Sequence, residues 1–376
     1  MKILVGDILK SKAQTLVNTV NCVGIMGKGI ALEFKKRFPK MFEDYLERCK
    51  RNEIHVGQPY IHKSLIGPQI VNFPTKEHWK SVSKVSDVVR GLDFLLDHYK
   101  EWGITSIAIP PLGCGNGQLE WKVVGPLIYS RAKQMDIPVE IYAPYGTNPS
   151  ELTVSFLENP SESKNAGSKI SRHKPISFNP VWVGLVEILH RIEEQPYHCP
   201  VGRTIFQKIA YVATQQGLPT GFNYQKSSYG PFSKELKLAE SKLINNNLLQ
   251  EERLGKMFEV KVGPAFKKAQ KQYKSLLDKY SYVIEKTTDL FMRVDTKQAE
   301  TLATVIFVSA ELKKIKKGSV SEIDVLDAVM QWKQRRRPKL DQATVASTIR
   351  NLGMLHWLDI IPDDKLPVSE ENEICV

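Results

Sequence analysis

Two glycine-rich loops are the part of this sequence where residue types and spacing point most clearly to chemistry. Residues 21–29 (NCVGIMGKG) and 110–118 (PPLGCGNGQ) each hold three glycines between a strand-like segment and a helix-like segment. Glycine lets backbone N–H groups approach an anion closely, and a helix N-terminus attracts phosphate. Neither loop has the spacing of the GxGxxG or P-loop motif. One such loop is usually a tight connection, whereas two in one α/β unit favour a shared diphosphate site.

Charged side chains near these loops suggest two further roles. Asp7 follows the strand-like residues 2–5, where its carboxylate could accept hydrogen bonds from an exocyclic amine such as that of adenine. It is equally suited to cap a helix. Lys80 follows the strand-like residues 69–73 and could act as an amine nucleophile, favoured by the neighbouring cation Lys76. By itself, a lysine in a polar loop is more often solvated.

The segments around these residues predict an α/β domain. Apolar runs typical of buried strands alternate with segments whose apolar residues recur at helical spacing. Several of the strands are apolar on both faces, which indicates a sheet between two helix layers. The strands are expected at 2–5, 16–21, 69–73, 107–109 and 139–142, and the helices at 30–38, 41–51, 82–100 and 120–135.

The composition changes after this domain. We expect an α/β domain over residues 1–155, a linker rich in Ser, Asn, Pro, Lys and Gly over 156–178, and a mainly α-helical domain over 179–376. Residues 248–262 are expected to form a hairpin, which together with the preceding helices resembles a winged helix. The expected helices are 181–194, 202–216, 232–246, 264–285, 296–315, 320–335 and 341–352.

Three motifs in order give the first domain a family resemblance. They are Gly6-Asp7-Ile8, the segment 17–21 with its glycine-rich loop, and the segment 109–115. The residues of these motifs and the separations between them resemble those of the macrodomain family over residues 1–150. The loops look like the branch that contains the terminal ADP-ribose protein glycohydrolase and the DarG-type antitoxins of DarT–DarG systems. The basic, helical second half also resembles the DarG layout.

The resemblance implies a set of site residues. Asp7 and Ile8 would bind the adenine side, Asn21 would lie near the distal ribose, and Tyr145 could pack on the adenosine. Lys80 would be the catalytic nucleophile. The full set of implied ligand-binding residues is Asp7, Ile8, Asn21, Gly27, Lys28, Gly29, Gly113, Cys114, Gly115, Asn116, Gly117, Gln118 and Tyr145.

The second loop departs from the pattern of the related protein glycohydrolase. That enzyme carries an aspartate that partners its lysine, whereas the corresponding position here is Gly117. No carboxylate lies within this loop before Glu120. Either Lys80 acts without such a partner or another group activates water. His78 is a candidate for that group, although a packing or surface role is more usual for such a histidine.

Function and partners follow from the resemblance. The expected activity is hydrolysis of the bond between ADP-ribose and a base of single-stranded DNA, with thymidine as the expected base and ADP-ribose as product. The second domain would bind a DarT-type toxin. No metal or redox cofactor is implied. Two alternatives stay open: a reader that binds ADP-ribose without turnover, and a phosphatase acting on ADP-ribose 1″-phosphate.

Charge, cysteine content and hydropathy limit the kinds of partner, cross-link and cellular compartment that are expected. The net charge of +12 is divided evenly between residues 1–150 and the remainder, which fits an anionic partner without identifying it. The five cysteines form no CxxC pair, which argues against a disulfide framework or a zinc site. Cys22 and Cys114 lie in the loops without an adjacent base. With no signal-peptide pattern and no apolar run of about 18 residues, a cytoplasmic protein is expected.

Overall fold

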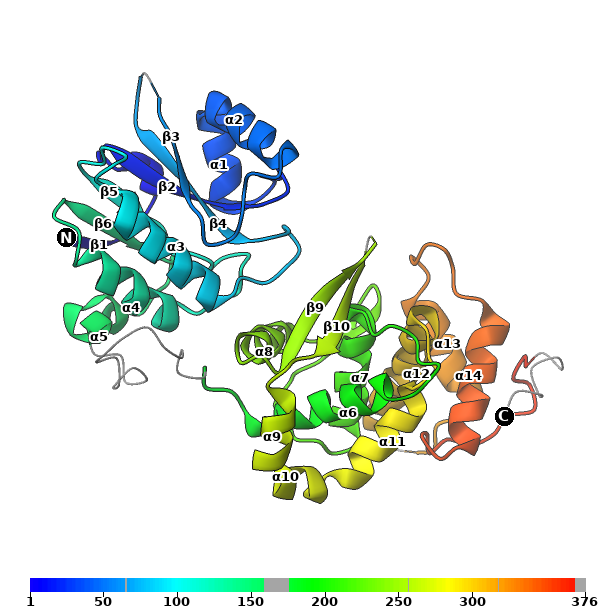
Figure 1. Cartoon of the computed structure of the whole chain (residues 1–376). Coiled ribbons are helices and arrows are strands. Elements are labelled where there is room, and N and C mark those ends of the chain that lie inside the picture. Colours follow the sequence, from blue (N-terminus) through cyan, green and yellow to red (C-terminus); the bar gives the residue numbers. More distant parts are fainter. Residues whose placement is uncertain (65, 159–175, 256, 317, 369–376) are drawn as a thin grey trace. The chain divides into compact units, whose positions relative to one another are not determined.

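The computed structural model describes residues 1–64, 66–158, 176–255, 257–316 and 318–368. Two units can be separated within the chain, Met1–Ile176 and Ser177–Val376 (Figure 1). In the described residues, no helix is both long enough and apolar enough to cross a membrane.

The first unit is built on a six-stranded sheet with the order β1-β6-β5-β2-β4-β3. All neighbouring strands are parallel except β3, which pairs antiparallel with β4 at the edge. The three half-buried residues of β3 are too few to show a strand pattern, and the sequence did not predict this strand. The strands are β1 (Lys2–Val5), β2 (Thr15–Asn21), β3 (Tyr60–His62), β4 (Gln69–Lys76), β5 (Ile107–Ile109) and β6 (Val139–Ala143).

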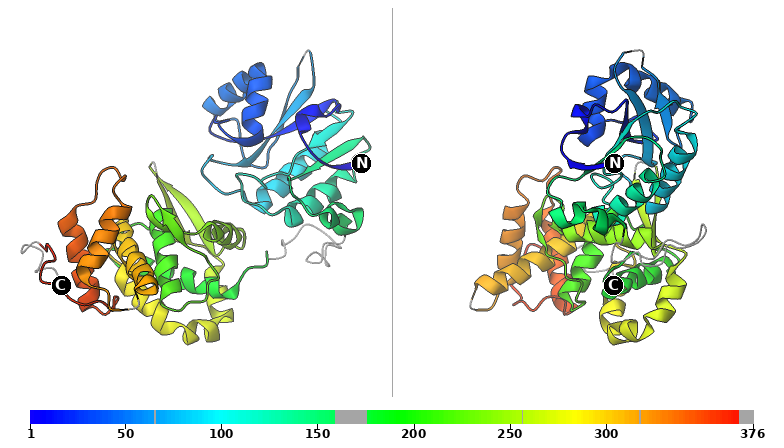
Figure 2. Two further views of the ribbon diagram at one scale, coloured as in Figure 1. Left: turned by 180° about the vertical axis from the view of Figure 1, so that it is seen from behind. Right: turned by 90° about the vertical axis from the view of Figure 1, so that its left-hand side faces the viewer.

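Helices cover both faces of this sheet (Figure 1 and Figure 2). On one side are α1 (Gly29–Arg37) and α2 (Pro39–Lys50); on the other are α3 (Val85–His98), α4 (Trp121–Ala132) and α5 (Val154–Glu158). Short 3-10 helices lie at Ile8–Lys10 and Pro149–Leu152.

Adjacent strand residues divide between two apolar cores, because successive side chains in a strand point to opposite faces. One core forms under α1 and α2 and the other under α3 and α4. The strand pairs that divide in this way are Leu16 and Val17, Ile70 and Val71, Ala108 and Ile107, and Tyr142 and Ile141, with the first of each pair facing α1 and α2. This confirms the predicted three-layer α/β/α fold.

The beginning of the expected linker is ordered structure. Residues 156–158 complete α5, in which Leu157 is 2% exposed and packs in the core that includes α4. Glu158 accepts hydrogen bonds from Tyr129 (3.2 Å) and Lys133 (2.7 Å) on α4. Residues 159–175 of the expected linker lie outside the described residues.

The second unit is mainly helical, as predicted. It also contains two hairpins, β7 (Gln225–Ser227) with β8 (Gly230–Phe232) and β9 (Leu249–Leu254) with β10 (Met257–Val262). The sequence predicted the second hairpin but not the first. The winged-helix interpretation stays a prediction. The helices are α6 (Val183–Glu193), α7 (Arg203–Gln215), α8 (Lys234–Asn245), α9 (Phe266–Gln272), α10 (Lys274–Lys279), α11 (Ser281–Phe291), α12 (Thr296–Ile315), α13 (Glu322–Trp332) and α14 (Gln342–Met354), preceded by a 3-10 turn at Pro180–Trp182.

Candidate functional site

The carboxyl ends of five parallel strands bring the predicted site residues to one edge of the sheet. Asp7 follows β1 and Tyr145 follows β6, each two residues beyond the paired residues Val5 and Ala143. The two glycine-rich loops follow β5 and β2, and Lys80 follows β4. Four gaps between neighbouring strands, at about 4.8 Å each, span roughly 19 Å. The edge can therefore accommodate an extended ligand.

The two glycine-rich loops lie against each other. A Cβ atom placed on Gly29 would be 3.3 Å from Nδ2 of Asn116 in the second loop. Gly29 also has a φ of +60°, a conformation that glycine adopts without strain. It begins α1, whose N-cap residue Lys28 is extended and makes no side-chain capping hydrogen bond. The first N–H groups of α1 are therefore available to an anion beside the second loop.

Asn21 shapes the first loop from inside. Its side chain is buried, and Oδ1 accepts hydrogen bonds from the backbone N–H groups of Val23 (3.0 Å) and Ile25 (3.4 Å). Nδ2 donates to the carbonyl oxygen of Ile25, and Tyr45 on α2 donates to the backbone oxygen of Asn21 (2.8 Å). This positioning role was not predicted. The signal that could have suggested it is an asparagine at the strand end, where its amide can satisfy turn backbone groups.

The second loop closes tightly around Ser83. Gly113 has a φ of +73°, and a Cβ there would lie 2.8 Å from Leu119. A Cβ on Gly117 would lie 2.5 Å from the backbone oxygen of Gly113 and closer still to Oγ of Ser83. Ser83 in turn donates its N–H to the Gly117 carbonyl (3.0 Å). Position 117 in this loop thus has no space for the side chain of an aspartate.

Lys76 connects β4 to the second loop. The pairing of β2 with β4 shifts here, so that Val20 pairs with Pro74 but Asn21 pairs with Lys76. Such irregularities re-aim side chains next to functional sites. Nζ of Lys76 donates a hydrogen bond to the backbone oxygen of Asn116 (3.0 Å). This bond holds the second loop in position. The predicted effect of Lys76 on Lys80 stays a prediction.

Lys80 lies in a turn that is attached to the first loop. Cys22 donates its backbone N–H to the carbonyl of Glu77 (3.0 Å). The N–H of Lys80 donates to Nδ1 of His78 (3.2 Å), and Nζ lies 5.0 Å from the ring centre of Trp79. Lys80 itself is exposed.

At the other end of the edge, Asp7 caps the short helix Ile8–Lys10. Its Oδ1 accepts the N–H of Leu9 at 3.0 Å, as the capping alternative predicted. The exposed carboxylate still has acceptor capacity for a ligand. The side chain of Ile8 is only 3% exposed and belongs to the core, so its contact with a ligand is limited to the backbone. Tyr145 is 77% exposed and free of this core.

The loop cysteines are unsuited to nucleophilic catalysis. Burial raises the pKa of the Cys22 thiol to about 12, and burial does the same to the pKa of Cys114. A thiol attacks as its thiolate, so neither is reactive near neutral pH. Among the described residues, no group of three or more His, Cys, Asp and Glu side chains is arranged to hold a metal ion.

The arrangement combines an anion site with an amine. An uncapped helix start and two glycine-rich loops can hold phosphates at the centre of the edge. A hydrogen-bond acceptor, Asp7, lies toward one end, and the amine of Lys80 lies toward the other. The geometry suits an elongated, phosphate-containing ligand whose reactive end reaches Lys80.

Comparisons with known proteins agree with this geometry. Residues 17–128 match the Macro domain family. The DNA ADP-ribosyl glycohydrolase of Mycobacterium tuberculosis is 35% identical over 243 residues, covering 62% of this chain and 64% of that protein. The chain thus spans slightly less than two thirds of that relative. The aligned length also exceeds the 176 residues of the first unit, so the similarity extends into the second unit.

Two further proteins are similar to the first unit. A DNA ADP-ribosyl transferase–DNA ADP-ribosyl glycohydrolase fusion protein of Thermosipho africanus is 38% identical over 162 residues, which cover 38% of this chain and 42% of that protein. The solved macrodomain of Mycobacterium tuberculosis DarG is 46% identical, covers 38% of this chain and 97% of that structure, and superposes with a TM-score of 0.37.

Proposed function

The first unit of this chain belongs to the macrodomain family, and on that premise we propose that the chain is a DNA ADP-ribosyl glycohydrolase. The observation that carries the proposal is the single edge that joins two touching glycine-rich loops to the exposed amine of Lys80. The names of the similar mycobacterial and Thermosipho proteins support the same activity.

ADP-ribose would lie along this edge from β1 toward β4. Asp7 accepts hydrogen bonds from the adenine amine, and Tyr145 packs on the adenosine. The diphosphate lies between the loops, on the backbone of residues 27–29 and 113–118, with Lys28 adding positive charge. The distal ribose then lies near the turn that carries Lys80. This order is supported by the strand order β1-β6-β5-β2-β4.

Lys80 is the proposed nucleophile. Its amine attacks C1″ of the distal ribose while the bond from C1″ to the base nitrogen breaks. The electron pair of that bond stays with the base nitrogen, which takes up the proton that the attacking amine releases. Water then attacks C1″, gives a proton to the departing lysine nitrogen and so releases ADP-ribose and the free amine. The bound nucleic acid excludes water from the exposed Lys80. Because residue 117 is a glycine, no carboxylate of that loop takes part in this reaction.

The biological setting is part of the proposal. The substrate is single-stranded DNA, with thymidine as the expected modified base. The partner is a DarT-type toxin bound by the second unit, and the location is cytoplasmic. Two observations support an antitoxin. The similar Thermosipho protein is named as a fusion of a DNA ADP-ribosyl transferase and a glycohydrolase. The similarity to the mycobacterial glycohydrolase continues beyond the first unit of this chain.

The exposure of Lys80 and the glycine at 117 favour one rival, a reader that binds ADP-ribose without turnover. A substrate panel separates the candidates: single-stranded DNA carrying ADP-ribosylated thymidine, ADP-ribose 1″-phosphate, and free ADP-ribose. We expect release of ADP-ribose from the DNA. Phosphate release alone would establish the phosphatase instead, and binding of ADP-ribose without any release would establish the reader. Either result would overturn the proposal.

A further inference from the structure

The segment 264–282 of the second unit combines positive charge with aromatic residues. It forms α9, α10 and the start of α11 and contains five lysines, one aspartate and three tyrosines. Lys267, Lys268 and Lys271 are exposed. Spacings of three and four residues place these three lysines on one face of α9. The buried residues of the same helix, Phe266 and Ala269, are on its other side.

This charge is not neutralised within the described part of the chain. None of Lys267, Lys268 and Lys271 has a carboxylate within ion-pair distance there, whereas Lys274 pairs with Asp278 at 2.8 Å. A row of unpaired, exposed lysines attracts an anionic polymer more strongly than a row of paired ones. The face of α9 is therefore suited to contact phosphates.

Two other basic runs of the second unit, residues 313–318 and 333–339, are different. In the first run, Lys313 pairs with Asp359 (2.8 Å) and Lys314 pairs with Glu311 (2.9 Å). In the second run, Lys333 and Arg336 both bind the buried carboxylate of Glu300, at 2.9 and 2.8 Å. Much of the charge of these runs thus serves intramolecular contacts.

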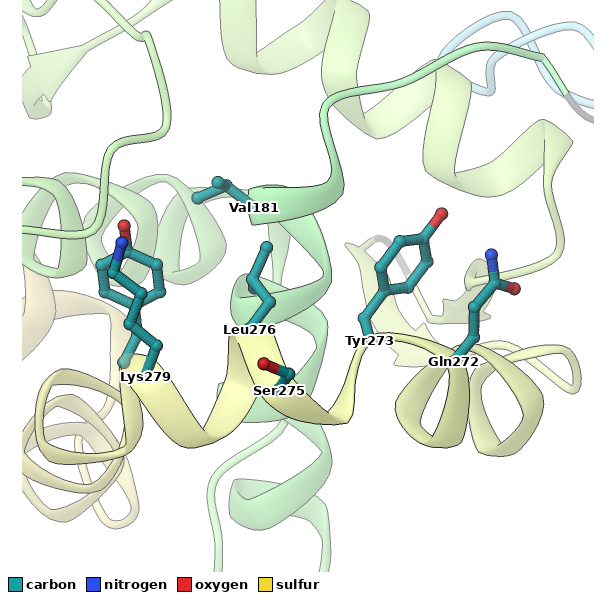
Figure 3. Close-up of a pocket in the computed structure, with 7 residues that line it drawn as sticks. Val181, Gln272, Tyr273, Ser275, Leu276 and Lys279 are labelled. Carbon is teal, nitrogen blue, oxygen red and sulfur yellow. The ribbon is translucent and has the colours of Figure 1, made fainter.

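A pocket of about 360 Å³ opens beside α9 and α10. Val181 and Leu276 contribute apolar walls, and Figure 3 shows both between Tyr273 on one side and Lys279 on the other. Tyr280, Gln272 and Ser275 complete the lining. The pocket thus combines aromatic rings with hydrogen-bonding groups and an ammonium, which suits a planar, polar ring such as a nucleobase.

Two helix breaks lie at tyrosines that line this pocket. The sequence predicted one continuous helix over 264–285, but the chain leaves helical geometry at Tyr273 (φ −105°, ψ 22°) and again at Tyr280 (φ −107°, ψ 17°). Both interruptions place a tyrosine at a junction between short helices. Both tyrosines line the pocket.

We propose that this surface, α9 together with the Tyr273–Tyr280 pocket, binds single-stranded nucleic acid. The lysines of α9 contact the phosphates, and an unpaired base enters the pocket and stacks on tyrosine. The inference rests on the proposed function in one respect: the bound strand is the one whose base carries ADP-ribose. It assigns to the second unit a role in holding substrate, in addition to the proposed binding of a toxin.

The test measures binding of the full chain to an unmodified, fluorescein-labelled oligothymidine by anisotropy at several salt concentrations. A variant with Lys267→Gln, Lys268→Gln and Lys271→Gln removes three phosphate contacts. Each phosphate contact on a single strand contributes about 0.7 to the slope of log Kd against log salt concentration, so this variant should lower that slope by about 2. The matched control, Lys313→Gln with Lys314→Gln, should keep the wild-type slope. Equal slopes for both variants, or no binding by the wild-type chain, would overturn the proposal.

Stacking in the pocket is tested by Tyr273→Ala and Tyr280→Ala. Each should weaken binding at least about fivefold without changing the salt slope, and Tyr273→Phe should restore it. Circular dichroism checks that the variants fold. If polyglutamate competes as well as the oligomer at equal ionic strength, the surface takes acidic polypeptides and the proposal is wrong. Because no turnover is measured, this result is independent of whether the chain releases ADP-ribose.

Discussion

Substituting Gly117 with alanine should damage the second glycine-rich loop, because the added methyl group has no space. Its carbon would lie 2.5 Å from the Gly113 carbonyl oxygen and closer still to Oγ of Ser83. Gly113 belongs to the loop, and Ser83 is hydrogen-bonded to it. Overpacking of this kind costs about 1–3 kcal/mol. For a unit of 176 residues, each kcal/mol lowers Tm by about 2–4 °C. The expected decrease is therefore about 2–12 °C.

Gly115→Ala is the matched control for this prediction. It adds the same methyl group two residues away, where a Cβ would meet nothing within 4 Å. Thermal unfolding of the ligand-free chain, followed by near-ultraviolet circular dichroism, compares the two variants with the wild type. Titration with ADP-ribose should show reduced affinity in Gly117→Ala. If Gly117→Ala unfolds at the same temperature as Gly115→Ala, the steric account of the missing aspartate is wrong.

Three further predictions concern other contacts. Lys76→Ala removes the hydrogen bond to Asn116 and should weaken ADP-ribose binding about two- to tenfold by calorimetry, and unchanged affinity would contradict that role. Glu300→Ala leaves the buried Lys333 without its carboxylate and should lower the free energy of unfolding, measured in urea, by about 3–5 kcal/mol. A loss below about 1 kcal/mol would refute this prediction. Burial lowers the pKa of Lys208 to about 8. Between pH 8 and about 10 the unfolded chain therefore binds more protons than the folded chain, so the free energy of unfolding should rise with pH relative to that of Lys208→Met. Parallel profiles of unfolding free energy against pH for the two proteins would contradict this.

Much of the first unit could be predicted because its elements are short and strongly patterned. The strand 107–109 is wholly apolar, and the sheet buries both its faces, so its position follows from composition. The strand Tyr60–His62 was missed since three half-buried edge residues carry no periodic signal. The breaks at Tyr273 and Tyr280 were missed for a related reason: no glycine or proline marks them, and the apolar spacing continues across both.

The site was predictable in its residue types but not in its contacts. Strand order brought Asp7, the two loops and Lys80 to one edge, as parallel strands require. By contrast, the bond from Lys76 to Asn116 joins residues 40 positions apart, which no local pattern reveals. The crowding at Gly117 likewise depends on Ser83, a residue with no motif of its own.

The most direct test of the central claim is a single-turnover assay on single-stranded DNA carrying ADP-ribosylated thymidine, with the wild-type chain and its Lys80→Ala variant. Binding of ADP-ribose is measured in parallel, because Lys80 is exposed and its removal should leave the loops intact. The account predicts release by the wild type, loss of release by at least about a hundredfold in the variant, and similar ADP-ribose affinity in both. Release by Lys80→Ala at the wild-type rate would contradict the assignment of the nucleophile.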